Sequence, residues 1–149
     1  MIAVTNILES TRNKLKSLKD IPVYLDEVKE SFKSPCFFLK TIKTTVPEKE
    51  FLYKTQLTLY ITYYAKKGHN SALELLAIKD LVNYAFAKGI FVDDSNKNKR
   101  YLRFASIENE TIGKDADIVE FTLRTSYLER MHQENPELIR DVYVNENLI

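Results

Sequence analysis

The feature that most constrains the fold is a long alternation of apolar and polar residues between Phe51 and Tyr64. Its odd positions carry Phe, Tyr, Thr, Leu, Leu, Ile and Tyr, while its even positions include Lys54 and Gln56. Because successive strand residues point to opposite faces of a sheet, this pattern predicts one long strand with a single buried face. Such a strand is longer than the core of a small domain needs, so we expect part of it to project or bend.

A second alternation covers residues 118–131 and predicts the last strand of the chain. Its apolar face carries Val119, Phe121, Leu123, Tyr127 and Met131. Shorter strands are predicted at residues 23–28, at 36–42 after Pro35, at 90–92 and at 100–107. The polar residues 93–99 separate the last two of these strands, so we expect a long hairpin tip in solvent.

Two segments repeat apolar residues at steps of three and four and are predicted to be amphipathic helices. The first has apolar residues from Val4 to Leu18 and places Lys19 in its last turns. It stops at Asp20-Ile21-Pro22, because the residue before a proline is pushed out of the helical region. The second runs over residues 72–88, and Gly89 stands where a helix C-terminus favours glycine.

The predicted order of elements is α, β, β, β, α, β, β, β. Adjacent strands joined by short polar turns indicate an α+β fold, a mainly antiparallel β-sheet with two amphipathic helices packed on one face. We expect residues 1–135 to form a single domain and residues 136–149 to form a C-terminal tail. The predicted core combines Leu57, Leu59, Ile61, Phe121 and Leu123 with the helix residues Leu8, Leu15, Leu75, Val82 and Phe86.

Composition excludes several classes of protein. The 149 residues carry a net charge of +1, without the excess of Lys and Arg that general nucleic-acid binding needs. The longest apolar runs are four residues, against about 20 for a membrane helix, so we expect a soluble protein. The 3 glycines lie too far apart to build a phosphate-binding loop.

No catalytic or metal-binding set is predicted. His69 and His132 lack further ligands at metal spacing, and Cys36 lies in an apolar run without a base beside it. Asp93 and Asp94 resemble the start of a calcium loop, but the glycine and the glutamate that such a loop requires are missing. We therefore expect no enzymatic activity, no cofactor and no metal.

The order of segments is more specific than the composition. It begins with a helix, a short strand and a strand that starts PCFFL at residues 35–39. An aromatic strand ending LYITYY at residues 59–64, a helix, a hairpin and a long final strand follow. This order resembles that of the tail terminator proteins of long-tailed bacteriophages. The resemblance covers residues 2 to 131. It is to the small terminators of Gram-positive phages and phage-derived tail particles, in which a PCFF strand after the first helix is common. The tip 93–100 and the tail after Pro136 depart from that pattern.

The resemblance implies a structural subunit that caps the last ring of the tail tube as a hexameric ring. Such a subunit stops tube polymerisation and provides the surface that joins the head. The implied partners are further copies of the chain, the tail-tube protein and the head-side connector, with a sheath as an additional candidate. Neither a membrane nor a sequence-specific nucleic acid is implied. The expected location is the host bacterial cytoplasm during assembly and then the virion tail.

Two regions and two tyrosines are the candidate interface. The hairpin tip and the apolar-ended tail have little to bury within a compact domain. Tyr60 and Tyr64 stand on the polar face of the long strand, where they either pack on the surface of the sheet or form an interface. The candidate residues are Asp93, Asp94, Lys97, Lys99, Arg100, Tyr60, Tyr64, Val142, Tyr143 and Val144.

Other functions compete with the terminator. A neck, head-completion or tube-like virion protein would share a small α+β fold and ring assembly. A small ligand-binding or enzymatic α+β domain would instead show a dominant pocket with convergent polar groups. A nucleic-acid module would show salt-dependent binding. The tail also has an alternative, which is to pair with an edge of its own sheet.

Overall fold

The computed structural model describes residues 2–25, 32–66, 72–94, 98–113 and 116–130. Two helices and seven strands are present in these ranges. In chain order they are α1 (Val4–Leu18), β1 (Val23–Leu25), β2 (Cys36–Lys49), β3 (Leu52–Tyr64), α2 (Ala72–Ala87), β4 (Ile90–Asp93), β5 (Lys99–Leu102), β6 (Ser106–Ile112) and β7 (Ile118–Arg130). The α+β prediction is confirmed.

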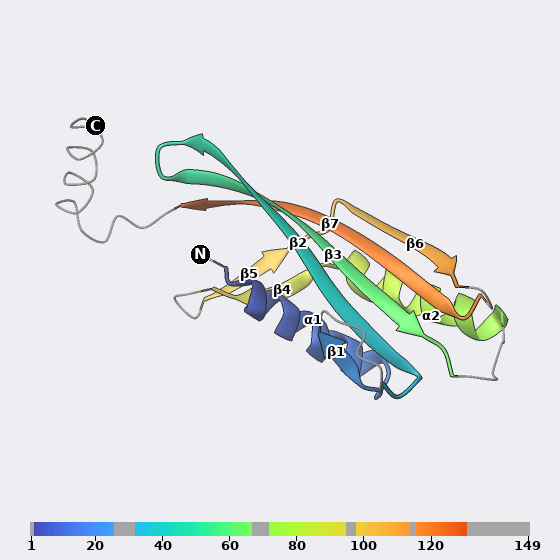
Figure 1. Ribbon diagram of the computed structural model, residues 1–149. Coiled ribbons are helices and arrows are strands. Elements are labelled where there is room, and N and C mark those ends of the chain that lie inside the picture. The colour runs from blue at the N-terminus through green and yellow to red at the C-terminus, as the bar shows by residue number, and fades with distance from the viewer. Residues whose placement is uncertain (1, 26–31, 67–71, 95–97, 114–115, 131–149) are drawn as a thin grey trace.

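The main sheet has five strands in the order β1-β2-β3-β7-β6. The pairs β2–β3, β3–β7 and β6–β7 are antiparallel, whereas β1 runs parallel to β2. Strand β3 is central, and each of its residues has a partner on both β2 and β7. As predicted, part of this pairing projects: the β2–β3 turn extends beyond the helices (Figure 1).

The core lies between the two helices and one face of the main sheet. Every predicted core residue except Leu8 is buried, and Leu8 is half-buried against the same cluster. In α1 the fully buried positions are Ile7, Thr11 and Leu15, so Ile7 takes the place expected of Leu8. Since α1 and α2 bury side chains in this one cluster, both helices cover the same face of the sheet.

The prediction of a single strand over residues 100–107 is wrong. Strand β5 ends at Leu102 and pairs with β4 in a separate two-stranded sheet, whereas β6 begins at Ser106 and pairs with β7. The chain changes sheets between them, where the Ala105 amide donates to the Arg124 carbonyl at 2.7 Å. Leu102 and Phe104 are both buried, so the alternation of side chains continues across the break and hides it from the sequence.

Other boundaries differ from the prediction or lie outside the described residues. Strand β2 extends to Lys49 rather than residue 42, because it pairs with β3 along its length. Helix α2 ends at Ala87, and Gly89 follows in a left-handed conformation with φ 78°. Its amide donates to the Phe86 carbonyl, and a side chain there would collide with the Leu102 carbonyl. Residues 26–28 and 131 of the predicted strands lie outside the described residues.

We expect Leu59→Ala and Phe121→Ala each to lower the free energy of unfolding by about 2–5 kcal/mol, because each truncation leaves a cavity in the core. Both side chains are fully buried. Leu73→Ala is the matched control, since Leu73 is 78% exposed, and it should change stability by less than about 0.5 kcal/mol. Urea unfolding followed by circular dichroism measures all three. Unchanged midpoints in both core variants would contradict this core.

Candidate interaction surface

The described residues hold no set that could bind a metal ion: no group of three or more His, Cys, Asp and Glu side chains lies together in them. Cys36 is fully buried, and burial raises the pKa of its thiol to about 11, so the thiol stays protonated at neutral pH. His69 and His132 lie outside the described residues. In the same part of the chain, no helix is long and apolar enough to cross a membrane.

Two edges of the main sheet lack a neighbouring strand in the described structure. Strand β1 pairs only with Phe37–Leu39, so β2 from Lys40 onward has no partner on the side away from β3. Strand β6 pairs only with β7. Such edges present unpaired backbone amides and carbonyls, which another strand can pair with.

The face of the main sheet opposite the helices carries the two candidate tyrosines in different surroundings. Tyr60 is half-buried and lies in a cross-strand row between Lys40 of β2 and Thr122 of β7. Tyr64 packs in an aromatic cluster, with its ring centroid 5.3 Å from Phe38 and 4.9 Å from Phe32. Burial raises the pKa of Tyr64. Tyr64 therefore has a packing role within its own subunit, whereas Tyr60 makes no aromatic ring contact among the described residues.

The β4–β5 hairpin, which carries the candidate tip, is attached to α1. The Asn6 side-chain amide donates to the Asp93 carbonyl at 2.9 Å, and the Lys14 ammonium donates to the Gly89 carbonyl at 3.0 Å. The side chains of Asp93 and Lys99 are exposed. Asp94 accepts a hydrogen bond from the Asn98 amide at 3.0 Å and so belongs to the turn itself.

Arg100, on β5, contacts β7 of the main sheet. Its guanidinium lies over the Tyr127 ring, 5.7 Å from the centroid, and donates to the Leu128 carbonyl at 3.4 Å. Hence the base of the tip packs on its own domain, unlike the exposed side chains beyond it. The remaining candidates Lys97, Val142, Tyr143 and Val144 lie outside the described residues.

Polar groups are buried where β7 meets the start of α1. Glu129 is 5% exposed and accepts a hydrogen bond from the Ile2 amide at 3.3 Å. Tyr127 is 7% exposed, and its hydroxyl finds no hydrogen-bond partner in the described residues. The alternation of residues 118–131 correctly assigned Tyr127 to the buried face, but it gave no indication that a carboxylate shares this face.

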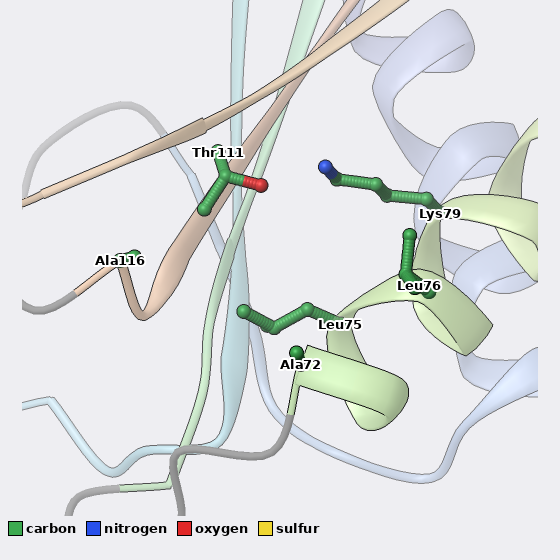
Figure 2. Close-up of a pocket in the computed structure, with 6 residues that line it drawn as sticks. All are labelled: Ala72, Leu75, Leu76, Lys79, Thr111 and Ala116. Atoms are coloured by element: carbon green, nitrogen blue, oxygen red, sulfur yellow. The ribbon is translucent and has the colours of Figure 1, made fainter.

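Helix α2 leaves apolar surface uncovered. Leu73 and Tyr84 are 78% and 70% exposed, and Leu76 is exposed as well. Beside them lies a groove of about 380 Å³ between α2 and the β6 side of the sheet. Figure 2 shows Leu75 and Lys79 extending from α2 toward the side on which Thr111 of β6 lies.

This apolar surface was not predicted. The available signal was that α2 is apolar on nearly every side, which is typical of a helix with partners on more than one face.

Free sheet edges, a projecting hairpin and an apolar helix surface are typical of a subunit that assembles with other proteins. The chain belongs to the phage tail terminator protein family, whose sequence model matches residues 3–137. The resemblance stated from the sequence is therefore confirmed. No curated protein matches the chain. The family is structural rather than enzymatic, which makes this chain a protein of the virion tail that interacts with other tail proteins.

Tyr127 gives a pH test of the buried polar groups. Burial, and after it the Glu129 carboxylate, raises the pKa of Tyr127 to about 12 against the ordinary 10.0, while Arg100 lowers it. The folded chain thus holds the hydroxyl proton more tightly than the unfolded chain. The resulting stabilisation is complete below about pH 10 and is lost as the pH rises toward about 12.

We expect Tyr127→Phe to flatten the fall in stability between about pH 10 and 12. At pH 7 its stability should match or exceed that of the wild type, because the variant removes a buried hydroxyl without a partner. Denaturant midpoints across the pH range measure both effects. Tyr60→Phe, on the open face of the sheet, is the matched control for the loss of one hydroxyl. An alkaline fall as steep as that of the wild type would contradict the prediction.

Proposed function

We propose that this chain is the tail terminator of its particle, acting as a hexameric ring on the last ring of the tail tube. The ring stops polymerisation of the tube and presents a joining surface to the head-side connector. Membership of the terminator family over residues 3–137 is the observation that carries the proposal.

The fold suits a ring. Strands β2 and β6 border opposite sides of the same sheet, so one chain offers two different edges. Contacts between different surfaces of identical subunits are heterologous, and they close into a ring when the rotation between copies allows it. Two unlike edges thus support cyclic assembly over a two-fold dimer.

The remaining surfaces are assigned to the other partners. The end of β2 beyond Val46 and the turn to β3 project from the body and suit contact with the tail-tube protein (Figure 1). The tip side chains Asp93, Lys97 and Lys99 and the tail residues Val142, Tyr143 and Val144 are proposed to contact neighbours in the assembled particle. A sheath is a further candidate partner in a contractile tail.

The proposed life cycle begins in the cytoplasm of the host bacterium, where tails assemble, and ends in the virion tail. The near-neutral charge of the chain favours protein partners over a nucleic acid. We assign it no membrane and no sequence-specific nucleic-acid partner.

Electron microscopy of particles made without this protein tests the function. Tails that are overlong and lack heads, restored to normal length when the gene is supplied in trans, are the expected result. Tails of normal length that merely fail to join heads would contradict the terminator and indicate a neck or head-completion protein instead.

Deleting residues 137–149 should leave a folded subunit that no longer joins the ring or docks on the tube, because the apolar tail side chains supply contacts to a neighbour. The measurement is binding to purified tail tubes, with circular dichroism as the check on folding. The full-length variant that combines Val142→Ser, Tyr143→Ser and Val144→Ser is the matched control for chain length. It should also fail to bind. Capping by the truncated chain, or its unfolding, would contradict an interface role.

A further inference from the structure

The two free edges of the main sheet have matching lengths. Among the described residues, the free edge of β2 begins at Lys40, after the last residue that pairs with β1. It is interrupted at Pro47, which has no backbone N–H to donate. The stretch between them, Lys40 to Val46, is as long as the whole of β6, which has 7 residues. A strand the length of β6 therefore fits the edge of β2 without displacing β1.

The two edges also carry opposite charge on the same face of the sheet. Lys40 lies in a cross-strand row with Tyr60 and Thr122, and Thr122 is the partner of Glu108 on β6. Since side chains directly opposite each other share a face, Lys40 and Glu108 both lie on the face opposite the helices. Glu110 follows on that face, two residues along β6.

Within one subunit, Glu110 is placed unfavourably. Its cross-strand partner is Glu120, and like charges directly opposite each other destabilise a sheet. The neighbouring Glu108 is neutralised, since its carboxylate accepts a hydrogen bond from the Arg124 guanidinium at 3.0 Å. Among the described residues no cation pairs with Glu110. The β6 edge therefore presents an acidic site that a lysine from outside the subunit would neutralise.

We propose that a second copy of this chain covers the edge, with β6 of one copy pairing with Lys40–Val46 of β2 in the next. This inference rests on the proposed ring and names its subunit contact. Strand β6 runs antiparallel to β2 within one subunit. A rotation about an axis parallel to the strands leaves strand directions unchanged, so β6 of a neighbouring copy also runs antiparallel to β2. The new ladder is therefore antiparallel and continues the sheet from copy to copy.

The matching lengths fix the register. Ile112 lies opposite Lys40, Glu110 opposite Ile42, and Ser106 opposite Val46. Lys40 then stands diagonal to Glu110 of the neighbouring copy, within reach of a long side chain.

The same arrangement covers the groove beside α2. Leu25 pairs with Leu39 in parallel register and so lies on the helix side of the sheet, where it is 56% exposed. Thr111 lies on the same side, facing the groove. In the proposed register the end of β1 meets the end of the neighbour's β6, which brings Leu25 of one copy to the apolar groove of the next.

Charge reversal tests the contact in the full-length chain. Each of Lys40→Glu and Glu110→Lys places like charges at every subunit contact and should reduce ring formation by at least about tenfold. An equal mixture of the two variants restores opposite charges at every contact of an alternating ring and should restore ring formation. Arg12→Glu and Glu9→Lys, on the exposed side of α1, are the matched controls and should assemble like the wild type.

The readouts are mass photometry of the protein alone and negative-stain microscopy with the tail-tube protein of the same particle. Rings from both single variants at wild-type levels would overturn the edge contact while leaving the terminator function standing. Loss in the single variants without rescue in the mixture would also overturn it. A wild-type chain that forms no rings and caps no tubes would overturn the proposed function, and this contact with it.

Cross-linking tests the register. In a Cys36→Ser background, the pair Ile42→Cys and Glu110→Cys lies directly opposite across the proposed contact, at a separation suited to a disulfide. Oxidation should yield a ladder of covalent oligomers on a non-reducing gel. Thr44→Cys with Glu110→Cys, displaced by two residues, is the matched control and should yield at least about tenfold less. Equal yields from the two pairs, or monomers alone, would overturn the register.

Discussion

The pairing of β3 with both β2 and β7 is the constraint on which the rest of the structure depends. Every residue from Leu52 to Tyr64 has a partner on each side, so the side chains of three strands are held in fixed rows. One face of these rows is apolar and is buried under α1 and α2. The other face carries polar and aromatic side chains together with the exposed aliphatic side chains of Ile42, Val46 and Leu128. In the described part of the chain, β1 covers only Phe37–Leu39 of β2, and β6 is the last strand of the sheet, so two edges are left open.

The small β4–β5 sheet shows how a surface feature is positioned by the core. Hydrogen bonds from α1 reach its backbone, and Arg100 lies over the buried Tyr127 ring. The exposed charges of Asp93 and Lys99 are therefore presented at a defined place rather than on a free loop. Asp93 and Lys99, anchored in this way, need little further ordering to meet a partner, which lowers the entropic cost of assembly.

Assembly explains features that a solitary subunit would not need. The described residues leave three kinds of unsatisfied surface on a subunit: opposed carboxylates at Glu110 and Glu120, a stretch of β2 without a neighbouring strand, and exposed leucines on α2. Membership of the tail terminator family provides the context in which such surfaces are used. The proposed edge contact brings Lys40 of a neighbour to Glu110 and pairs the open stretch of β2. It also brings Leu25 to the groove beside the exposed leucines of α2.

By itself, the sequence determined the strands of period two, both helices, the end of α2 before Gly89, nearly the whole core and the family. Tertiary structure alone decided the parallel pairing of β1, the change of sheets between Leu102 and Ser106, and which strands are edges. The physical reason is that alternation records which side chains are buried, whereas strand partners are chosen through backbone groups that every residue shares. For that reason the sequence singled out Tyr60 and Tyr64 together, and only the tertiary structure showed that Tyr64 belongs to an aromatic cluster with Phe32 and Phe38.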